Sequence, residues 1–234
     1  MHITEAIILA GGEGTRLKNA VPDLPKCMAP VNARPFISFV IDYLLSQKIE
    51  RFIFALGKGH QIITQYLNTQ YATLDRHCVI ENEPLGTGGA IRLACRETTA
   101  DSVLVVNGDS LFKIDVSNLS ILHKASAADC SIALKPMANT GRYGKVKMNA
   151  EGKIESFEEK KNTESGLVNG GVYILNVPEF LKLPFAGNFS FEKEFLESGN
   201  HRISGLVQDE YFIDIGTPED FEKVQLELRH PTLP

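Results

Sequence analysis

An apolar run near the start of the chain, residues 6–10, passes directly into the glycine-rich segment Gly11-Gly12-Glu13-Gly14-Thr15-Arg16. The run predicts a β-strand, and the glycines predict a tight loop whose backbone N–H groups can turn inward and closely approach an anion. Arg16 adds a planar set of donors that suits phosphate oxygens. Because an ordinary strand-to-helix turn can also be rich in glycine, this loop alone does not separate a phosphate site from a plain turn.

The first half of the chain alternates strand patterns with helix patterns. Four short apolar runs look like strands buried on both faces, as in a parallel sheet: residues 6–10, 52–56, 79–81 and 103–107. Apolar residues recur at helical spacing in three segments between them: residues 36–44, 62–67 and 90–94, the last begun by the glycines of residues 86–89. This alternation predicts an α/β fold with right-handed crossovers and a Rossmann-like, doubly wound sheet.

The second half of the chain is richer in strand patterns. Four segments are strand-like: residues 130–135, 144–148, 153–158 and 168–175. Residues 149–152 predict a hairpin turn between the second and third of these. A last helix is expected to begin at Pro218, with Thr217 as its N-cap and Asp220 in its first turn. We predict a single domain over residues 1–234, in which two halves, approximately 1–115 and 116–234, share one sheet.

The overall charge and the cysteines exclude several classes of protein. The formal net charge is −5, which argues against general binding to nucleic acid. No apolar run approaches the length of a membrane span, and no basic region precedes the first apolar run, so neither a membrane anchor nor a secretory signal is expected. The four cysteines lack metal-ligand spacing, which favours free thiols and a cytoplasmic location. The sequence leaves open whether the chain forms a homo-oligomer.

Charged side chains follow several of the predicted strands, where ligands bind in open α/β sheets. Asp109 comes directly after the apolar run 103–107, and Asp214 ends another apolar run. Two aspartates that converge from distant strands could hold Mg²⁺ for phosphoryl transfer, although a lone aspartate there is more often a turn or capping residue. Lys26 lies in a loop stiffened by Pro25 and Pro30, which suits a fixed cation for phosphate. By itself it would be a solvated surface lysine.

Two further carboxylates, Glu81 and Glu83, stand before the glycine-rich turn of residues 86–89. A carboxylate can accept hydrogen bonds from both N1–H and N2–H₂ of guanine, whereas uracil and thymine offer one donor flanked by acceptors. The sequence therefore favours guanine if either glutamate faces the base. Both could equally be exposed loop charges.

Together these segments resemble the sugar-1-phosphate nucleotidyltransferases, the NDP-sugar pyrophosphorylases. The matching segments occur in the order typical of that family and span nearly the whole chain: LAGGEGTRL (9–17), PKCMAPV (25–31), EPLGTGGA (83–90), NGD (107–109), RYG (142–144), FEEK (157–160), NGGVY (169–173) and FIDIGTPEDF (212–221). The resemblance implies a Rossmann-like core of the GT-A type with inserted sugar-binding β elements. Its substrates would be a nucleoside triphosphate and a sugar 1-phosphate, with Mg²⁺ as cofactor.

The resemblance also implies roles for individual residues. Those that would bind the nucleotide are Leu9, Gly11, Gly12, Gly14, Thr15, Arg16, Glu83 and Gly88. Those that would contact the sugar phosphate are Tyr143, Gly144, Glu159, Lys160 and Asn169. Arg16, Lys26 and Asp109 would act in catalysis, and Asp109 and Asp214 would bind the metal. Cys27 departs from the pattern, since many relatives carry a second proline there.

Within the family, the chain is most similar to the D-glycero-α-D-manno-heptose 1-phosphate guanylyltransferases. A mannose-1-phosphate guanylyltransferase and a uridylyltransferase for amino-sugar 1-phosphates are the alternatives. A glycosyltransferase would not need Arg16 in a glycine loop, and an oxidoreductase would need a different glycine pattern and an acidic residue where the second strand ends Leu56-Gly57-Lys58. A nucleotide-sugar sensor without catalytic activity would be expected to have lost Lys26 or an aspartate.

Overall fold

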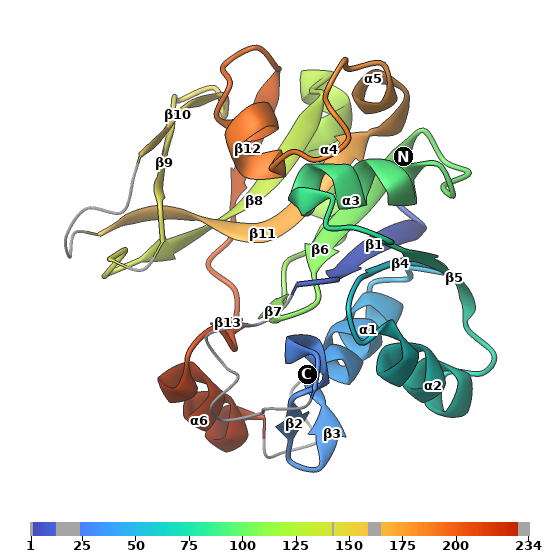
Figure 1. Cartoon of the computed structure of the whole chain (residues 1–234). Helices are drawn as coiled ribbons and strands as arrows, with labels where there is room; N and C mark the ends of the chain where they lie inside the picture. The colour runs from blue at the N-terminus through green and yellow to red at the C-terminus, as the bar shows by residue number, and fades with distance from the viewer. Residues whose placement is uncertain (1, 13–23, 142, 159–164, 229–234) are drawn as a thin grey trace.

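Strand β1 (Glu5–Ala10) lies inside a nine-stranded sheet, between β4 (Arg51–Leu56) and β6 (Ser102–Asn107), and runs parallel to both. The computed structural model describes residues 2–12, 24–141, 143–158 and 165–228. Along its main path the sheet has the order β10-β9-β11-β6-β1-β4-β5 (Figure 1). The side chains of β1, β4 and β6 are almost all buried, which confirms these three predicted strands.

The fourth predicted strand of the first half is real, but the expectation that both its faces are buried was wrong. Strand β5 (Asp75–Ile80) is the last strand of the sheet order and runs parallel to β4. Its side chains alternate in exposure, and only Val79 is buried. An edge strand is covered on one side only, so polar residues such as His77 are tolerated in it.

The second half of the chain continues the same sheet with antiparallel strands. The long strand β11 (Gly166–Asn176) pairs antiparallel with β6, and also with β8 (Cys130–Met137) and β9 (Lys145–Met148). Strand β10 (Ile154–Glu158) forms the predicted hairpin with β9, and β12 (Ile203–Val207) runs parallel to β8. The sheet is therefore mixed.

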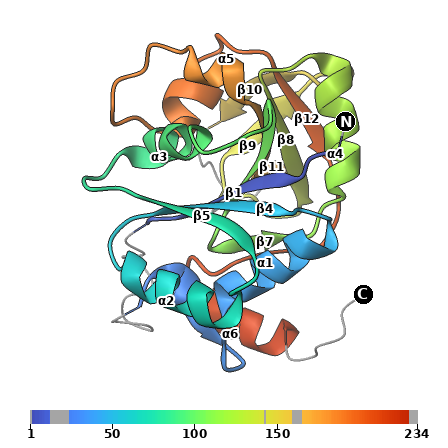
Figure 2. The same cartoon turned by 90° about the vertical axis from the view of Figure 1, so that its right-hand side faces the viewer.

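Helices cover both faces of this sheet and form a separate apolar core on each (Figures 1 and 2). Helices α1 (Phe36–Ser46), α2 (His60–Gln70) and α6 (Pro218–Glu227) contribute to one core. Helices α3 (Gly86–Cys95) and α5 (Val177–Leu181), with the π-helix η2 (Phe191–Leu196), contribute to the other. Successive residues of β1 serve opposite cores, Ile7 one and Ile8 the other. The doubly wound arrangement is thus confirmed.

The expected C-terminal helix α6 begins as predicted. The Thr217 side chain accepts a hydrogen bond from Asp220 N, and Pro218 is the first helical residue. Helix α4 (Val116–Ser126), by contrast, was not anticipated; Asp115 caps it by accepting from Asn118 N. In the described part of the chain, no helix combines the length and the apolar character that crossing a membrane requires.

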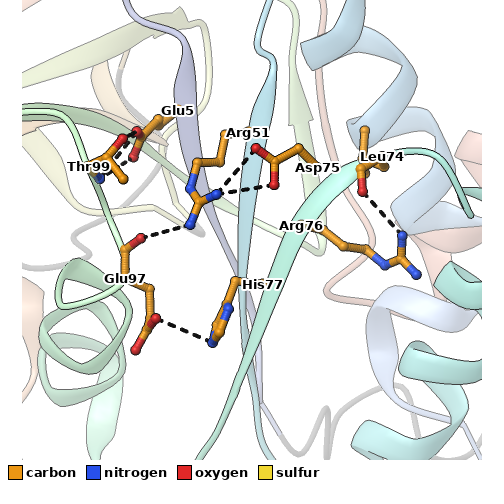
Figure 3. Close-up of polar contacts among 8 residues, drawn as sticks. All are labelled: Glu5, Arg51, Leu74, Asp75, Arg76, His77, Glu97 and Thr99. Carbon is orange, nitrogen blue, oxygen red and sulfur yellow. Dashed lines mark hydrogen bonds and ion pairs between the residues drawn. The ribbon is translucent and has the colours of Figure 1, made fainter.

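Polar contacts join the amino ends of the parallel strands to neighbouring segments (Figure 3). The buried Glu5 carboxylate accepts from Thr99 N at 3.0 Å, and Arg51 donates to Asp75 Oδ1 at 3.1 Å and to Glu97 O at 3.3 Å. Much of the polar chemistry at this end of the sheet is thereby used within the protein itself. The carboxyl ends of the strands are different, because they open into a cavity.

Candidate functional site

The carboxyl ends of β1, β4, β5 and β6 border a cavity of about 960 Å³, called the first cavity below. Four residues predicted to bind a nucleotide lie in its wall: Leu9, Gly11, Gly12 and Glu83. Gly11 directly follows β1 and packs so closely that a Cβ there would lie 2.8 Å from Glu81 Oε1. The same Cβ would lie 3.1 Å from Gly57 N, so a larger residue here would require both the Glu81 side chain and the neighbouring backbone to shift.

A second cavity of about 680 Å³ adjoins the first. Its wall includes Tyr143, Gly144 and Asn169, the three described residues predicted to contact a sugar phosphate. Three residues belong to both walls: Asn107, Asp109 and Glu192. The two cavities therefore meet at Asp109, and a group bound in one can reach a group bound in the other there.

Three predicted catalytic and metal-binding residues meet at this junction. Lys26 Nζ lies 2.6 Å from Asp109 Oδ2 and 4.0 Å from Asp214 Oδ1. Lys26 was expected in an irregular loop. It belongs instead to a 3₁₀-helix, η1 (Lys26–Met28), which follows Pro25. The lysine side chain is 14% exposed, so its charge is largely shielded from water and its ion pairs are screened less than surface ones.

A small two-stranded sheet brings the two aspartates together. Strand β7 (Ser110–Phe112) follows Asp109 and pairs antiparallel with β13 (Phe212–Asp214), so that Asp214 lies opposite Ser110. Ile215 N donates to Asp109 O at 3.1 Å, and Gly216 N donates to Asp214 Oδ1. Backbone pairing thus fixes the main chain of both aspartates, and the bond from Gly216 N orients the Asp214 carboxylate.

The same residues fit a divalent cation in their chemistry. Asp109 and Asp214 offer carboxylate oxygens close enough to share one cation, the ammonium of Lys26, and such oxygens are the ligands that Mg²⁺ prefers. No group of three or more histidine, cysteine or acidic side chains is gathered for a metal within the described ranges. Any metal held here would complete its coordination with water or substrate oxygens, as Mg²⁺ commonly does.

The hairpin that follows the Lys26 helix is hydrogen-bonded to α6, the helix that follows Asp214. Strands β2 (Pro30–Val31) and β3 (Arg34–Pro35) follow η1 and form the hairpin. Gln225 of α6 donates to Pro30 O at 2.6 Å and accepts from Asn32 N at 2.9 Å, while its backbone oxygen accepts from Asn32 Nδ2 at 3.2 Å. These bonds span more than 190 positions of sequence and join the elements that follow Lys26 and Asp214.

The two candidate guanine-binding glutamates differ in what they contact. Glu81 Oε2 accepts from Leu85 N at 2.9 Å and so closes the turn that leads into α3. Glu83 lines the first cavity and makes no hydrogen bond to the described parts of the chain. Glu83 therefore has both carboxylate oxygens without a partner in the described chain, whereas Glu81, which also lines this cavity, has one.

Gly88 lies beside the first cavity but not in the described wall. Its N–H donates to Phe189 O at 2.9 Å, and a Cβ at this position would run into the Phe189 ring. The Phe189 ring stacks on Phe185 with ring centroids 4.4 Å apart. A glycine is required here for packing between α3 and the segment before η2, whatever its relation to a ligand.

The floor of the second cavity is a polar array that sequence reasoning recognised only in part. Asn169 donates from Nδ2 to Tyr173 Oη at 2.8 Å and accepts from Gly171 N at 2.8 Å. Gly171 has a φ of +70°, and the pairing of β11 with β8 shifts register between Asn169 and Tyr173. Burial, reinforced by the charge of Glu192, raises the pKa of the Tyr173 hydroxyl well above its usual range, so it stays protonated.

Several wall residues were missed, among them Asn107, Glu192 and Tyr173. Asn107 ends β6 and could have been found by the strand-end argument that identified Asp109. Nothing in the sequence around Glu192 indicates that it lies beside Asp109. Five other predicted site residues lie outside the described ranges: Gly14, Thr15, Arg16, Glu159 and Lys160.

The chain is similar to known proteins along nearly its whole length. Residues 5–230 match the Nucleotidyl transferase family. The chain is 42% identical to a D-glycero-alpha-D-manno-heptose 1-phosphate guanylyltransferase of Aneurinibacillus thermoaerophilus, over 97% of this chain and 99% of that protein. It is 40% identical to a protein of the same name from Campylobacter jejuni, over 93% of this chain and 96% of that protein.

Solved structures are similar as well. The crystal structure of HddC from Yersinia pseudotuberculosis superposes with a TM-score of 0.87 at 34% identity, covering 97% of this chain and all of that one. The crystal structure of HddC complexed with GMP-PN superposes with a TM-score of 0.86 over the same shares. A mannose-1-phosphate guanylyltransferase of Mycobacterium tuberculosis is 29% identical over 97% of this chain, which spans 65% of that protein.

Proposed function

Because the chain belongs to the Nucleotidyl transferase family, we propose that it transfers GMP from GTP to D-glycero-α-D-manno-heptose 1-phosphate, giving GDP-heptose and pyrophosphate. The observation that carries the proposal is the junction of two cavities at Asp109, with the Lys26 ammonium 2.6 Å from that carboxylate. Two polyanions brought from opposite sides would meet beside a fixed cation. In this proposal the two halves of the chain act as one nucleotidyltransferase unit.

The reaction is a single displacement at phosphorus. A phosphate oxygen of the sugar 1-phosphate forms a bond to the α-phosphorus of GTP, while the bond from that phosphorus to the bridging oxygen breaks and pyrophosphate leaves with its electron pair. The attacking phosphate is already ionised, so no side chain has to remove a proton. The protein has to align two reactants and stabilise negative charge in the transition state.

Lys26 supplies one positive charge at the junction. The resemblance of the sequence assigns two more to Arg16, for the triphosphate, and Lys160, for the sugar phosphate. With a net charge of −5, the chain has to gather such cations locally. Loss of any one of these cations would reduce stabilisation of the transition state and weaken substrate binding.

Mg²⁺ is the cation we assign to Asp109 and Asp214. When bound, it would neutralise phosphate charge and orient the triphosphate. The ammonium of Lys26 between the two carboxylates supports this assignment, since it marks a place where a cation is held. The roles of the chain's own residues are to bind this ion and to hold Lys26 near the reacting phosphates.

Glu83 is the residue we assign to the guanine base. It lines the first cavity with a carboxylate that the described chain does not use, and guanine has two adjacent donors for it.

A cytoplasmic location is part of the same proposal, supported by four free cysteines, three of them buried. Mannose 1-phosphate is the second candidate acceptor, because mannose-1-phosphate guanylyltransferases are also among the relatives.

Pyrophosphate release with Mg²⁺ tests the proposal directly. GTP, UTP, dTTP and CTP are each paired with the manno-heptose 1-phosphate, mannose 1-phosphate and an amino-sugar 1-phosphate. Release with GTP and the heptose phosphate, at the highest kcat/KM of the panel, is expected. Preference for mannose 1-phosphate would change the acceptor, preference for UTP would overturn the role of Glu83, and no release with any pair would overturn the proposed activity.

A further inference from the structure

Glu192 is a wall residue of both cavities that the nucleotidyl transfer described above does not use. It is the second residue of the π-helix η2, and it shares both walls with Asn107 and Asp109, which lie at the end of β6 and directly after it. Its position in both walls places its carboxylate near the point where the two substrates of the proposed reaction would meet.

The side chain of Glu192 is held at one of its two oxygens. Oε2 accepts from Thr87 Oγ1 at 2.6 Å and from Ser190 Oγ at 3.0 Å. Thr87 Oγ1 in turn accepts from Phe191 N at 2.8 Å, which fixes the hydroxyl. Oε1 accepts no hydrogen bond from the part of the chain that the structure describes, so the carboxylate is pre-oriented with one acceptor available.

The surroundings of Glu192 favour a hydroxyl group as its ligand. A carboxylate repels phosphate oxygens and accepts from O–H donors. Its charge acts on Tyr173, which together with Asn169 lies in the second cavity, so Glu192 is close to the polar array of that cavity. Among the substrates of the proposed reaction, the sugar 1-phosphate carries several hydroxyls into this cavity.

We propose that Glu192 binds a hydroxyl of the sugar 1-phosphate through Oε1 and thereby helps to select the acceptor. This inference rests on the proposed function, since it takes the second cavity as the sugar site. The ribose of the nucleotide offers the same chemistry from the other side of the junction, and the experiment has to distinguish the two sources.

The test compares Glu192→Gln and Glu192→Ala with Glu194→Gln in steady-state pyrophosphate release. Glu194 is a matched control, because its Oε2 accepts from Ser190 N on the same helix while it lies in neither described wall. Loss of a hydrogen bond to a charged acceptor is expected to raise KM for the sugar 1-phosphate by roughly tenfold or more in Glu192→Ala. KM for GTP should be unchanged, and Glu194→Gln should behave as the wild type.

Three outcomes would overturn the proposal. A rise in KM for GTP that disappears with 2′-deoxy-GTP or 3′-deoxy-GTP would assign Glu192 to the ribose instead. An equal effect of Glu194→Gln would reduce Glu192 to a cap of η2. Unchanged constants in both Glu192 variants would remove any role in binding.

Calorimetric titration of mannose 1-phosphate or the heptose 1-phosphate, without GTP, separates this proposal from the proposed function. Weaker binding to Glu192→Gln than to the wild type supports the hydroxyl contact even if no pyrophosphate is ever released. Equal affinities, or no saturable binding to the wild type, would overturn it.

Discussion

Lys26 Nζ and Asp109 Oδ2 lie 2.6 Å apart although 83 positions separate the two residues in the chain. The lysine comes from a 3₁₀-helix after β1, and the aspartate follows the neighbouring strand β6. The contact places a largely buried positive charge beside Asp109, whose carboxylate pairs with it and which lies in the walls of both cavities.

Replacement of Lys26 tests the contact itself. Lys26→Ala removes the positive charge that the proposed reaction places beside the phosphates, and we expect kcat to fall by about 10²- to 10³-fold, as for other preorganised electrostatic groups. Steady-state pyrophosphate release gives kcat, and far-ultraviolet circular dichroism checks the fold. A variant that folds and turns over normally would refute the role given to Lys26.

Gly88→Ala is expected to destabilise the protein through packing. The added Cβ meets the ring of Phe189, which is held by Phe185, and overpacking of this kind costs roughly 1–3 kcal/mol in the free energy of unfolding. Urea unfolding measures it. Gly187→Ala is the matched control, because a Cβ there has nothing within 4 Å; equal stabilities of the two variants would contradict the packing argument.

Gln225→Ala should lower kcat although Gln225 lines neither described cavity. The change removes the side-chain bonds to Pro30 O and Asn32 N, which join α6 to the hairpin after Lys26. We expect kcat to fall several-fold and stability to drop by about 1–2 kcal/mol. Leu226→Ala on the same helix, at a position 61% exposed, serves as control. A loss of stability with unchanged kcat would show that these hydrogen bonds of Gln225 do not position Lys26.

The buried His123 makes stability depend on pH. Burial lowers its pKa and outweighs the Asp129 charge, which acts in the opposite direction, and its Nδ1 lies 2.9 Å from Ser131 Oγ. The unfolded chain therefore binds a proton more readily, so the free energy of unfolding should fall as pH drops below the unfolded histidine pKa of about 6.5. Urea unfolding at pH 7.5 and 5.5 measures this.

His201 also has a pKa lowered by burial and contributes in the same direction, so variants are needed to assign the effect. His123→Gln should reduce the dependence on pH between 7.5 and 5.5, and His201→Gln should reduce it separately. A dependence that survives both substitutions would contradict the assignment.

Cys78 should be the first thiol to react with a disulfide reagent in the folded protein. Cys27, Cys95 and Cys130 are at most 3% exposed, and burial raises the pKa of Cys27 and of Cys95 to about 12. Cys78 is only half-buried. Colour release from a thiol reagent at pH 8 should show one fast phase, absent in Cys78→Ser. A fast phase that persists in this variant would contradict the prediction, because one of the three buried thiols would then be accessible.

The sequence predicted those elements whose pattern depends on local chemistry. Buried parallel strands are continuous apolar runs, and the start of α6 follows from the Thr217 cap. Helix α4 was missed because the side that it buries includes Ser120 and His123, so its apolar stripe is broken. Strand β5 was misjudged because its position at the sheet edge is a property of the topology.

The site divides in the same way. Asp109 and Asp214 were found because they follow or end strands, and a sheet gathers its strand ends. The 2.6 Å contact with Lys26 depends on how η1 returns to the sheet, which no spacing in the sequence encodes. The place of Glu192 in the site depends on the packing of η2 against α3, more than 100 positions away in the chain. Thr87 of α3 donates a hydrogen bond to the Glu192 carboxylate.

The continuity of the two cavities has a consequence for how the enzyme would work in a cell. In the proposed reaction each substrate would occupy one cavity, but the nucleotide sugar formed beside Asp109, which lines both, would occupy both. Accumulated product would thus compete with GTP and with the sugar 1-phosphate at the same time, whereas pyrophosphate would displace neither sugar nor base. Output would then follow the rate at which the next enzyme consumes the nucleotide sugar, without a separate regulatory site.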